Sequence, residues 1–214
     1  MLPYFPSDIA DAVIAGLADA AAARDAERAV RGVDALDELA LHPVLATGLA
    51  SAGYGGHREV RYPADRRKRK ISEGERCDFV LTPDGRPLRV PEAAATLFDC
   101  PDAVDLDDAF WLEVKVVAQF TTEGPNRQYA PQLLSTVGRD VTKLSKDEGI
   151  LHAGLLLILF VHVQEVADHD LGIWQDRCVA RSLPIAAPSI RRLPITDRLG
   201  NGLCVAALYP VRRM

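Results

Sequence analysis

Two strand-like runs of the chain combine apolar residues with a few ionisable ones. Asp78 lies in the run 77–81, and Glu113 and Lys115 lie in the run 111–117. Because side chains alternate between the two faces of a strand, Glu113 and Lys115 should point to the same face. An aspartate from a second strand beside them would complete a site for a hard divalent cation and a polarised water. The chemistry that this pattern predicts is metal-assisted hydrolysis of a phosphodiester.

An acid and a lysine two residues apart also occur on solvated strand faces, where the ion pair between them is weak. Here the surrounding residues 111–112, 114 and 116–118 are apolar on both faces, which is typical of a buried central strand. Buried Glu and Lys side chains are rare unless they are paired or functional. The context therefore favours a functional site over a solvated face.

The composition is that of an ordinary globular protein, with 214 residues of which 48% are hydrophobic and 26% charged. The four cysteines form no CxxC motif, which argues against a structural zinc site and for a reducing compartment. The longest apolar stretch, 153–161, is too short to cross a membrane, and the N-terminus lacks a signal-peptide pattern. We therefore expect a cytoplasmic protein without a membrane partner.

Charge is spread unevenly along the chain, whose net charge is −5. Residues 58–76 carry eight Lys or Arg against four acids, and residues 177–214 carry seven Arg against one acid. The remaining blocks are mainly acidic, so a basic face can exist on an acidic protein. The densest basic run is Arg66, Arg67, Lys68, Arg69 and Lys70, which we expect to contact nucleic-acid phosphates.

The pattern of apolar residues and turns predicts an α/β fold with a central mixed sheet of four to five strands, flanked by helices. The third and fourth strands should be parallel across the helix between them. Pro43 should kink or restart the second helix, and the prolines at 184, 188 and 194 predict an extended connector. We expect helices at 7–30, 34–52, 129–147 and 167–180, and strands at 57–62, 76–81, 110–118, 154–163 and 203–209.

This order of elements resembles the PD-(D/E)XK nuclease superfamily, which has the restriction-endonuclease-like fold. Asp78 on the second strand and Glu113-x-Lys115 on the third match the superfamily's motif over residues 34–163. Cys77 stands where a proline often precedes the aspartate, and the interval between Asp78 and Glu113 requires an insertion at about 83–109.

The resemblance implies roles for individual residues. Asp78, Glu113 and Lys115 would be catalytic, and Asp78, Glu113 and the carbonyl of Val114 would hold Mg²⁺ or Mn²⁺. Glu38 would supply the glutamate that many members carry on the preceding helix, with Glu59 as a competing candidate. The polar residue that some members carry on the helix after the third strand would be Gln132 or Gln128. His57, His152, His162 and His169 have no ligand spacing, and we expect them to be structural.

We expect three parts of the chain: an N-terminal helical extension at 1–33, a nuclease-like core at 34–163, and a C-terminal helix and strand at 164–214 that complete the same domain. The predicted function is a metal-dependent nuclease, with DNA as the favoured substrate and a homodimer as an open option. The alternative is a catalytically inactive protein of the same fold that binds nucleic acid or protein. A small-molecule enzyme on another α/β fold has no motif of its own here.

Overall fold

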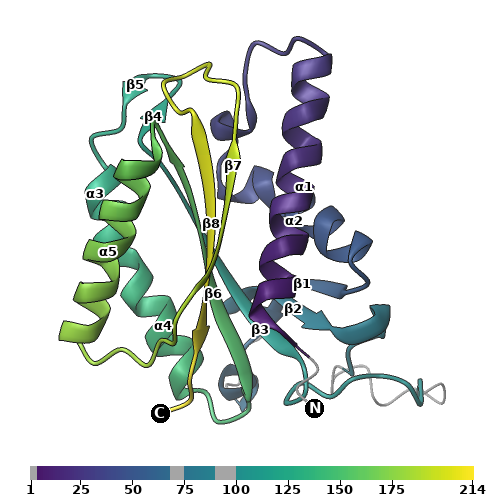
Figure 1. The fold of residues 1–214 in the computed structure, drawn as a ribbon. Helices are drawn as coiled ribbons and strands as arrows, with labels where there is room; N and C mark the ends of the chain where they lie inside the picture. Colours follow the sequence, from purple (N-terminus) through teal and green to yellow (C-terminus); the bar gives the residue numbers. More distant parts are fainter. Residues whose placement is uncertain (1–3, 68–74, 90–99) are drawn as a thin grey trace.

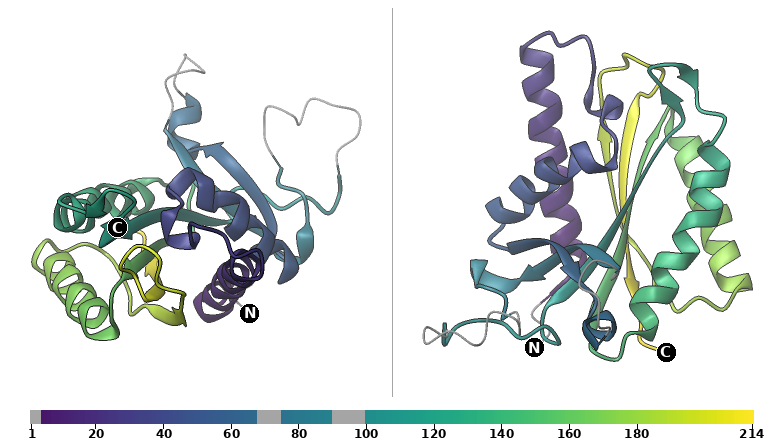
Figure 2. Two further views of the ribbon diagram at one scale, coloured as in Figure 1. Left: turned by 90° about the horizontal axis from the view of Figure 1, so that it is seen from above. Right: turned by 180° about the vertical axis from the view of Figure 1, so that it is seen from behind.

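The computed structural model describes residues 4–67, 75–89 and 100–214, which form a six-stranded mixed sheet between two layers of helices (Figure 1, Figure 2). Outer strands of this sheet are β1 and β7, and β3 and β6 lie at its centre. The strand order is β1 (Gly55–Arg61), β2 (Arg76–Thr82), β3 (Phe110–Ala118), β6 (His152–Val161), β8 (Leu203–Val211) and β7 (Ser189–Pro194).

The α/β class is confirmed, but the prediction of four to five strands was wrong because of β7. Residues 189–194 lie in the segment predicted as an extended connector, and they pair antiparallel with β8. Proline lacks the N–H group that a ladder needs, so it disfavours a strand in the middle of a sheet. Pro194 is the last residue of an edge strand, where this loss is tolerated.

The predicted parallel pairing of the third and fourth strands is confirmed. β1 and β2 form an antiparallel hairpin, and β3 runs parallel to β6 from Phe110↔His152 to Ala118↔Phe160. A crossover helix connects these two parallel strands, as parallel pairing requires. β6 is buried from Ala153 to Val161, which explains why its sequence is apolar without alternation.

One helical layer consists of α1 (Pro6–Ala26) and α2 (Glu38–Ser51), and the other of α4 (Val137–Lys146) and α5 (Gln164–Ala180) (Figure 1). Helix α1 ends four residues earlier than predicted. A 3₁₀ turn, η1 (Val33–Ala35), occupies the predicted start of the second helix. α2 begins later because Asp37 caps it, accepting the N–H of Ala40 at 2.8 Å. It then continues through Pro43 without a restart.

The helical segment after β3 is not one regular helix. It starts with α3 (Tyr129–Pro131), passes through a π-turn, η5 (Gln132–Thr136), and continues as α4. The loop before it contains a two-stranded hairpin of β4 (Phe120–Thr121) and β5 (Gly124–Pro125). A π-turn rotates the residues that follow it relative to a regular helix. It therefore changes which side chains of α4 face the sheet.

The segment 83–109, predicted as an insertion, is described at its two ends only. A 3₁₀ turn, η4 (Pro83–Gly85), follows β2, and a single bridge joins Leu88 to Val104. Residues 90–99 lie outside the described part. Leu106 is nearly buried, and its carbonyl accepts the indole N–H of Trp111 at 3.0 Å. The end of this segment is thus tied to the start of β3.

Each face of the sheet has its own hydrophobic core. On the α4–α5 side the core includes Trp111, Leu155 and Trp174, and on the α1–α2 side it includes Leu45 and Leu112. Neighbouring residues of β3 therefore enter opposite cores. Glu113 and Lys115 continue the row of Trp111, so they point towards the side of the sheet that α4 covers.

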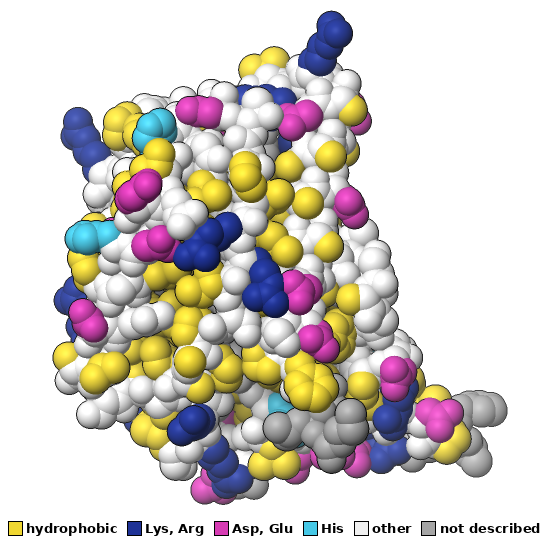
Figure 3. Space-filling view, in the orientation of Figure 1, with side chains coloured by type: hydrophobic (Ala, Val, Ile, Leu, Met, Phe, Trp, Pro, Cys, Tyr) yellow, Lys and Arg dark blue, Asp and Glu magenta, His cyan; other side chains and the backbone are white. Residues whose placement is uncertain are grey.

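The C-terminal part of the chain joins the two layers through ion pairs. Arg191 on β7 contacts Asp11 of α1, and Arg192 contacts Asp168 of α5. Figure 3 shows basic side chains beside acidic ones among hydrophobic side chains on this face. Arg198 is likewise paired, with Asp25 at 2.6 Å. Three arginines of the C-terminal basic block are therefore already neutralised.

In the described part of the chain, no helix has the length and apolarity that a membrane span requires.

Candidate active site

The candidate site forms where β2 separates from β3. The ladder between these strands runs from Leu81↔Phe110 to Phe79↔Leu112 and does not reach Asp78. The backbone N–H groups of β3 beyond this point need other acceptors. Asp78 Oδ2 accepts the N–H of Val114 at 2.8 Å, and Glu38 Oε2 accepts the N–H of Val116 at 3.3 Å. Two carboxylates thus occupy the place of the missing strand.

The same geometry places a backbone oxygen at the site. In an extended strand the N–H and C=O of one residue point to the same side. Because the Val114 N–H points to Asp78, the Val114 carbonyl also faces the gap between β2 and β3. The predicted trio of Asp78, Glu113 and the Val114 carbonyl therefore gathers at one end of this gap.

Glu113 is the most deeply buried acid of the site, with 3% of its surface exposed. Its Oε1 accepts the hydroxyl hydrogen of Tyr62 and lies 3.1 Å from Lys143 Nζ. Burial, followed by the neighbouring Asp78 carboxylate, raises the pKa of Glu113 to about 7. The two carboxyl groups interact directly, so they resist being ionised together unless a cation joins them.

Lys115 contacts different acids from the one that the sequence suggested. Its Nζ lies 3.1 Å from Glu38 Oε1 and 3.7 Å from Asp140 Oδ2, whereas the ammonium group nearest Glu113 belongs to Lys143. Burial lowers the pKa of Lys115, but Glu38 and Asp140 outweigh this effect and raise it overall. Lys115 therefore stays protonated at neutral pH.

We name these six residues the carboxylate–lysine cluster: Glu38, Asp78, Glu113, Asp140, Lys115 and Lys143. It contains four carboxyl groups and two ammonium groups, so acids outnumber bases. Burial raises the pKa of Asp78 and of Asp140, as it does for Glu113. The cluster thus holds an excess of negative charge, and its donors are oxygen atoms of the kind that Mg²⁺ and Mn²⁺ prefer. The residues present fit such a cation.

Sequence reasoning missed Tyr62, Asp140 and Lys143. One signal for Asp140 was available, because it precedes Val141 directly and lies four residues before Leu144, at the edge of the apolar stripe of α4 that these two residues form. A carboxylate at the edge of an apolar helical stripe is unusual unless it is paired or functional. Nothing local marks Tyr62, since its contact with Glu113 joins residues 51 positions apart.

Gln132 and Gln128 lie outside the cluster, on the exposed side of the segment after β3. Gln132 Oε1 accepts a hydrogen bond from Asn126 Nδ2 at 3.2 Å. It lines a cavity of about 360 Å³ together with Glu38 and Val116. The predicted glutamine is therefore a neighbour of Glu38 in this cavity.

The predicted basic run is only partly described. Arg66 and Arg67 end the 3₁₀ helix η2 (Pro63–Arg67), and Lys68, Arg69 and Lys70 lie outside the described residues. η2 follows Tyr62 directly, and its residues Ala64 and Asp65 line a cavity of about 420 Å³. The other lining residues include Tyr62, Lys143 and two further basic side chains, Arg139 and Lys146. The start of the basic run thus lies at the same end of the sheet as Glu113.

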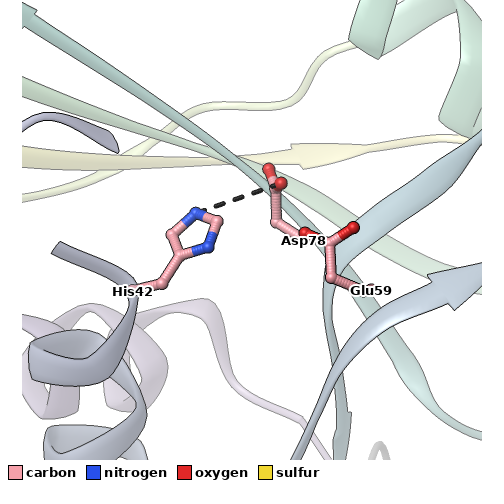
Figure 4. A group of neighbouring side chains, drawn as sticks. All are labelled: His42, Glu59 and Asp78. Atoms are coloured by element: carbon pink, nitrogen blue, oxygen red, sulfur yellow. Dashed lines mark ion pairs between the residues drawn. The ribbon is translucent and has the colours of Figure 1, made fainter. Parts of the chain in front are cut away.

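Glu59 lies beside Asp78 on the neighbouring strand β1. It is opposite Asp78 in the β1–β2 hairpin, between the pairs Arg58↔Phe79 and Val60↔Cys77. With His42 of α2, these acids bring three ligand atoms within 4.8 Å of one another (Figure 4). His42 was also missed by sequence reasoning, since nothing around it has metal-ligand spacing.

Comparison with protein-family models, with curated proteins and with solved structures finds no match to this chain.

Proposed function

We propose that the protein is a metal-dependent nuclease with a restriction-endonuclease-like core that hydrolyses phosphodiester bonds of DNA. The order α2, β1, β2, β3, α4 and β6 supports the assignment of the core, because it agrees with the order expected from the resemblance. The observation that carries the proposal is the meeting of Asp78, Glu113 and the Val114 carbonyl where β2 and β3 separate.

The donor set suits Mg²⁺ or Mn²⁺, held by Asp78, Glu113 and the Val114 carbonyl. Such a cation, when bound, supplies charge relief at the phosphate and a water of lowered pKa. The protein's own residues prepare this site. Lys143 and the Tyr62 hydroxyl both contact Glu113 Oε1, and they fix the orientation of this carboxylate.

Lys115 can act as a hydrogen-bond donor and a positive charge, because Glu38 and Asp140 keep its ammonium group protonated. This protonation excludes Lys115 as a general base near neutral pH. Its role is instead to hold a proton at Nζ, to orient the attacking water and to stabilise charge on the phosphoryl oxygens. Glu38 positions Lys115 from the first turn of α2.

One observation favours the alternative of an inactive binding module. Lys115 contacts two carboxylates and Lys143 contacts Glu113 and Asp140, so each ammonium group already has partners inside the protein. Such a network can serve stability alone. The excess of acids over bases, with raised pKa values at three of them, argues for a cation and hence for the nuclease.

Cleavage of plasmid, linear duplex and single-stranded DNA, with Mg²⁺ or Mn²⁺ and with a chelator, tests the proposal. Glu113→Gln and Lys115→Met should each lower cleavage at least about 100-fold, the usual cost of removing one preorganised group. The matched control is Glu165→Gln, an exposed glutamate in the first turn of α5. It should cleave like the wild type.

Thermal melts must accompany these assays, since removing one partner of a buried charge pair also destabilises a protein. A folded Glu113→Gln variant with full activity would exclude the proposed site. DNA binding by the wild type without cleavage under any of these conditions would instead support the inactive binding module. A homodimer and a cytoplasmic location stay predictions.

A further inference from the structure

His42 presents a buried nitrogen to Asp78. The side chain has no exposed surface, and its Nε2 lies 3.9 Å from Asp78 Oδ1, too far for a hydrogen bond (Figure 4). Among the described residues, this nitrogen has no hydrogen-bond partner. A buried polar atom without a partner is costly, so it calls for a ligand or another explanation.

The spacing suits a shared cation. Two ligands that each lie about 2.1 Å from a metal are separated by roughly 3–4 Å, depending on the angle between them. The His42–Asp78 separation of 3.9 Å falls in this range. The Glu59 carboxylate completes the group, with all three ligand atoms within 4.8 Å of one another.

The backbone at Glu59 is unusual for a strand. Its φ is 55°, in the left-handed region that non-glycine residues seldom adopt. Among described residues of β1, the ladder partners stop at Arg58 and resume at Val60, so Glu59 interrupts the pairing opposite Asp78. This local distortion turns the Glu59 side chain to the same region as His42 and Asp78 (Figure 4).

We infer that His42, Glu59 and Asp78 form a second divalent-cation site, which shares Asp78 with the Asp78–Glu113 site and is selective for a transition metal such as Mn²⁺ or Zn²⁺ over Mg²⁺. An imidazole nitrogen with carboxylates suits these borderline metals, whereas Mg²⁺ prefers oxygen donors only. Asp78 belongs to both sites: Oδ2 faces Val114 and Oδ1 faces His42. The side chain of Glu59 is exposed, so a cation can enter from solvent on that side.

Arg58 opposes this cation. Its Nη2 lies 3.0 Å from His42 Nδ1, and a guanidinium can only donate, so Nδ1 holds the lone pair and Nε2 the proton. A metal at Nε2 needs the reverse arrangement, with the proton on Nδ1. Metal binding must therefore displace Arg58, which is exposed and can turn into solvent.

Titration of the metal-free protein with Mn²⁺, followed by electron paramagnetic resonance and calorimetry, tests the inference. The wild type should bind two Mn²⁺ ions, and pulsed spectra should show ¹⁴N coupling from a histidine. Glu59→Gln should weaken the ¹⁴N-coupled ion at least about tenfold, since even partners outside the ligand shell change metal affinity 10–100-fold. Arg58→Ala should tighten the same ion.

Glu113→Gln is the matched variant for the other site, and it should remove the ion without ¹⁴N coupling while the coupled ion stays. His42→Gln should abolish the ¹⁴N coupling. Because His42 is buried, this substitution can also impair folding, so the variants at the exposed residues Glu59 and Arg58 are the decisive test of the second site. Absence of ¹⁴N coupling in the wild type, or unchanged Mn²⁺ binding in Glu59→Gln, would overturn the second site. If Glu113→Gln still binds the ion without ¹⁴N coupling while the other variants behave as expected, the second site is supported and the proposed nuclease site is contradicted.

Discussion

At the scale of single residues, the candidate site brings carboxyl groups closer than their charges favour. Glu113 is buried beside Asp78, and its pKa of about 7 is well above the ordinary value of 4.5. Only part of the repulsion is relieved by Lys143 and Tyr62. Residues arranged in this way reduce stability, and such arrangements cluster at functional sites.

The raised pKa of Glu113 predicts how stability depends on pH in the absence of metal. Between about pH 4.5 and 7 the folded protein binds more protons at Glu113 than the unfolded chain does, so stability falls as pH rises. The loss due to this group is at most about 3 kcal/mol, from 1.36 kcal/mol for each pKa unit. Urea unfolding of the metal-free protein at several pH values measures it.

Glu113→Gln cannot ionise, so its stability should vary less with pH over the same window. Glu165→Gln, at an exposed position, should keep the wild-type dependence. Identical curves for Glu113→Gln and the wild type would mean that Glu113 titrates at its ordinary pKa in the folded protein.

Some of the contacts in the candidate site could be predicted from the sequence. The same-face position of Glu113 and Lys115 follows from strand alternation alone, and the proximity of Asp78 follows from antiparallel pairing of β2 and β3. Their partners were not predictable in the same way. Lys143 contacts Glu113 from α4, which follows a π-turn, and His42 approaches Asp78 from α2, which packs beside the β1–β2 hairpin. Both depend on tertiary contacts that leave no spacing in the sequence.

At the scale of elements, the site depends on where α2 lies, because α2 carries both Glu38 and His42. A close crossing with α1 fixes this helix. A Cβ atom added at Gly48 would lie 2.4 Å from the Ala12 carbonyl oxygen and 3.0 Å from Gly16 Cα. The two helices therefore touch through their backbones, which only glycine permits.

Gly48→Ala should destabilise the protein by about 1–3 kcal/mol, the usual cost of forcing extra volume into a packed contact. Its clash is with backbone atoms, so the helices must move apart. Denaturant unfolding measures this destabilisation. The shift of α2 should also weaken cleavage in the variant that still folds, since Glu38 moves relative to Lys115.

The matched control is Gly172→Ala in α5, where an added Cβ atom meets nothing within 4 Å. The same substitution should there stabilise the protein by about 0.5–1 kcal/mol, because alanine favours a helix over glycine. Equal effects of the two variants would show that the α1–α2 crossing is not tightly packed.

Element order was largely predictable, and edges and irregular turns were not. The apolar runs of β3 and β6 have no other plausible place than the centre of a sheet. β7 was missed because its signal is weak: it is a half-exposed edge strand flanked by prolines. The 3₁₀ turn before α2 and the π-turn before α4 depend on packing rather than on residue type.

At the scale of the whole molecule, the protein is acidic, so a polyanion such as DNA must be attracted by a local basic patch. Three of the seven arginines of the C-terminal basic block, Arg191, Arg192 and Arg198, are paired with acids of α1 and α5, which weakens their attraction for a polyanion. Basic groups near Glu113 are better placed to attract a polyanion to the candidate site. Arg139 and Lys146 line the cavity that Tyr62 and Lys143 share, and the run 66–70 begins at its wall.

Neutralising Arg66, Arg67, Lys68, Arg69 and Lys70 should therefore weaken DNA binding and reduce its salt dependence. Removing one lysine or arginine from a phosphate lowers the slope of log K against log salt by about 0.9. Fluorescence anisotropy in the Glu113→Gln background avoids cleavage during the measurement. Metal binding should not change, because the run supplies no ligand.

A matched pair of substitutions separates this local patch from a general effect of charge. Arg191→Gln with Arg192→Gln also removes positive charge, but from side chains held by Asp11 and Asp168. These variants should bind DNA with a wild-type slope. If neutralising the run leaves the slope unchanged, Arg139→Gln with Lys146→Gln becomes the deciding variant. An unchanged slope there too would mean that the cavity beside Glu113 does not receive a nucleic-acid backbone, because long-range attraction to a polyanion needs a local positive patch.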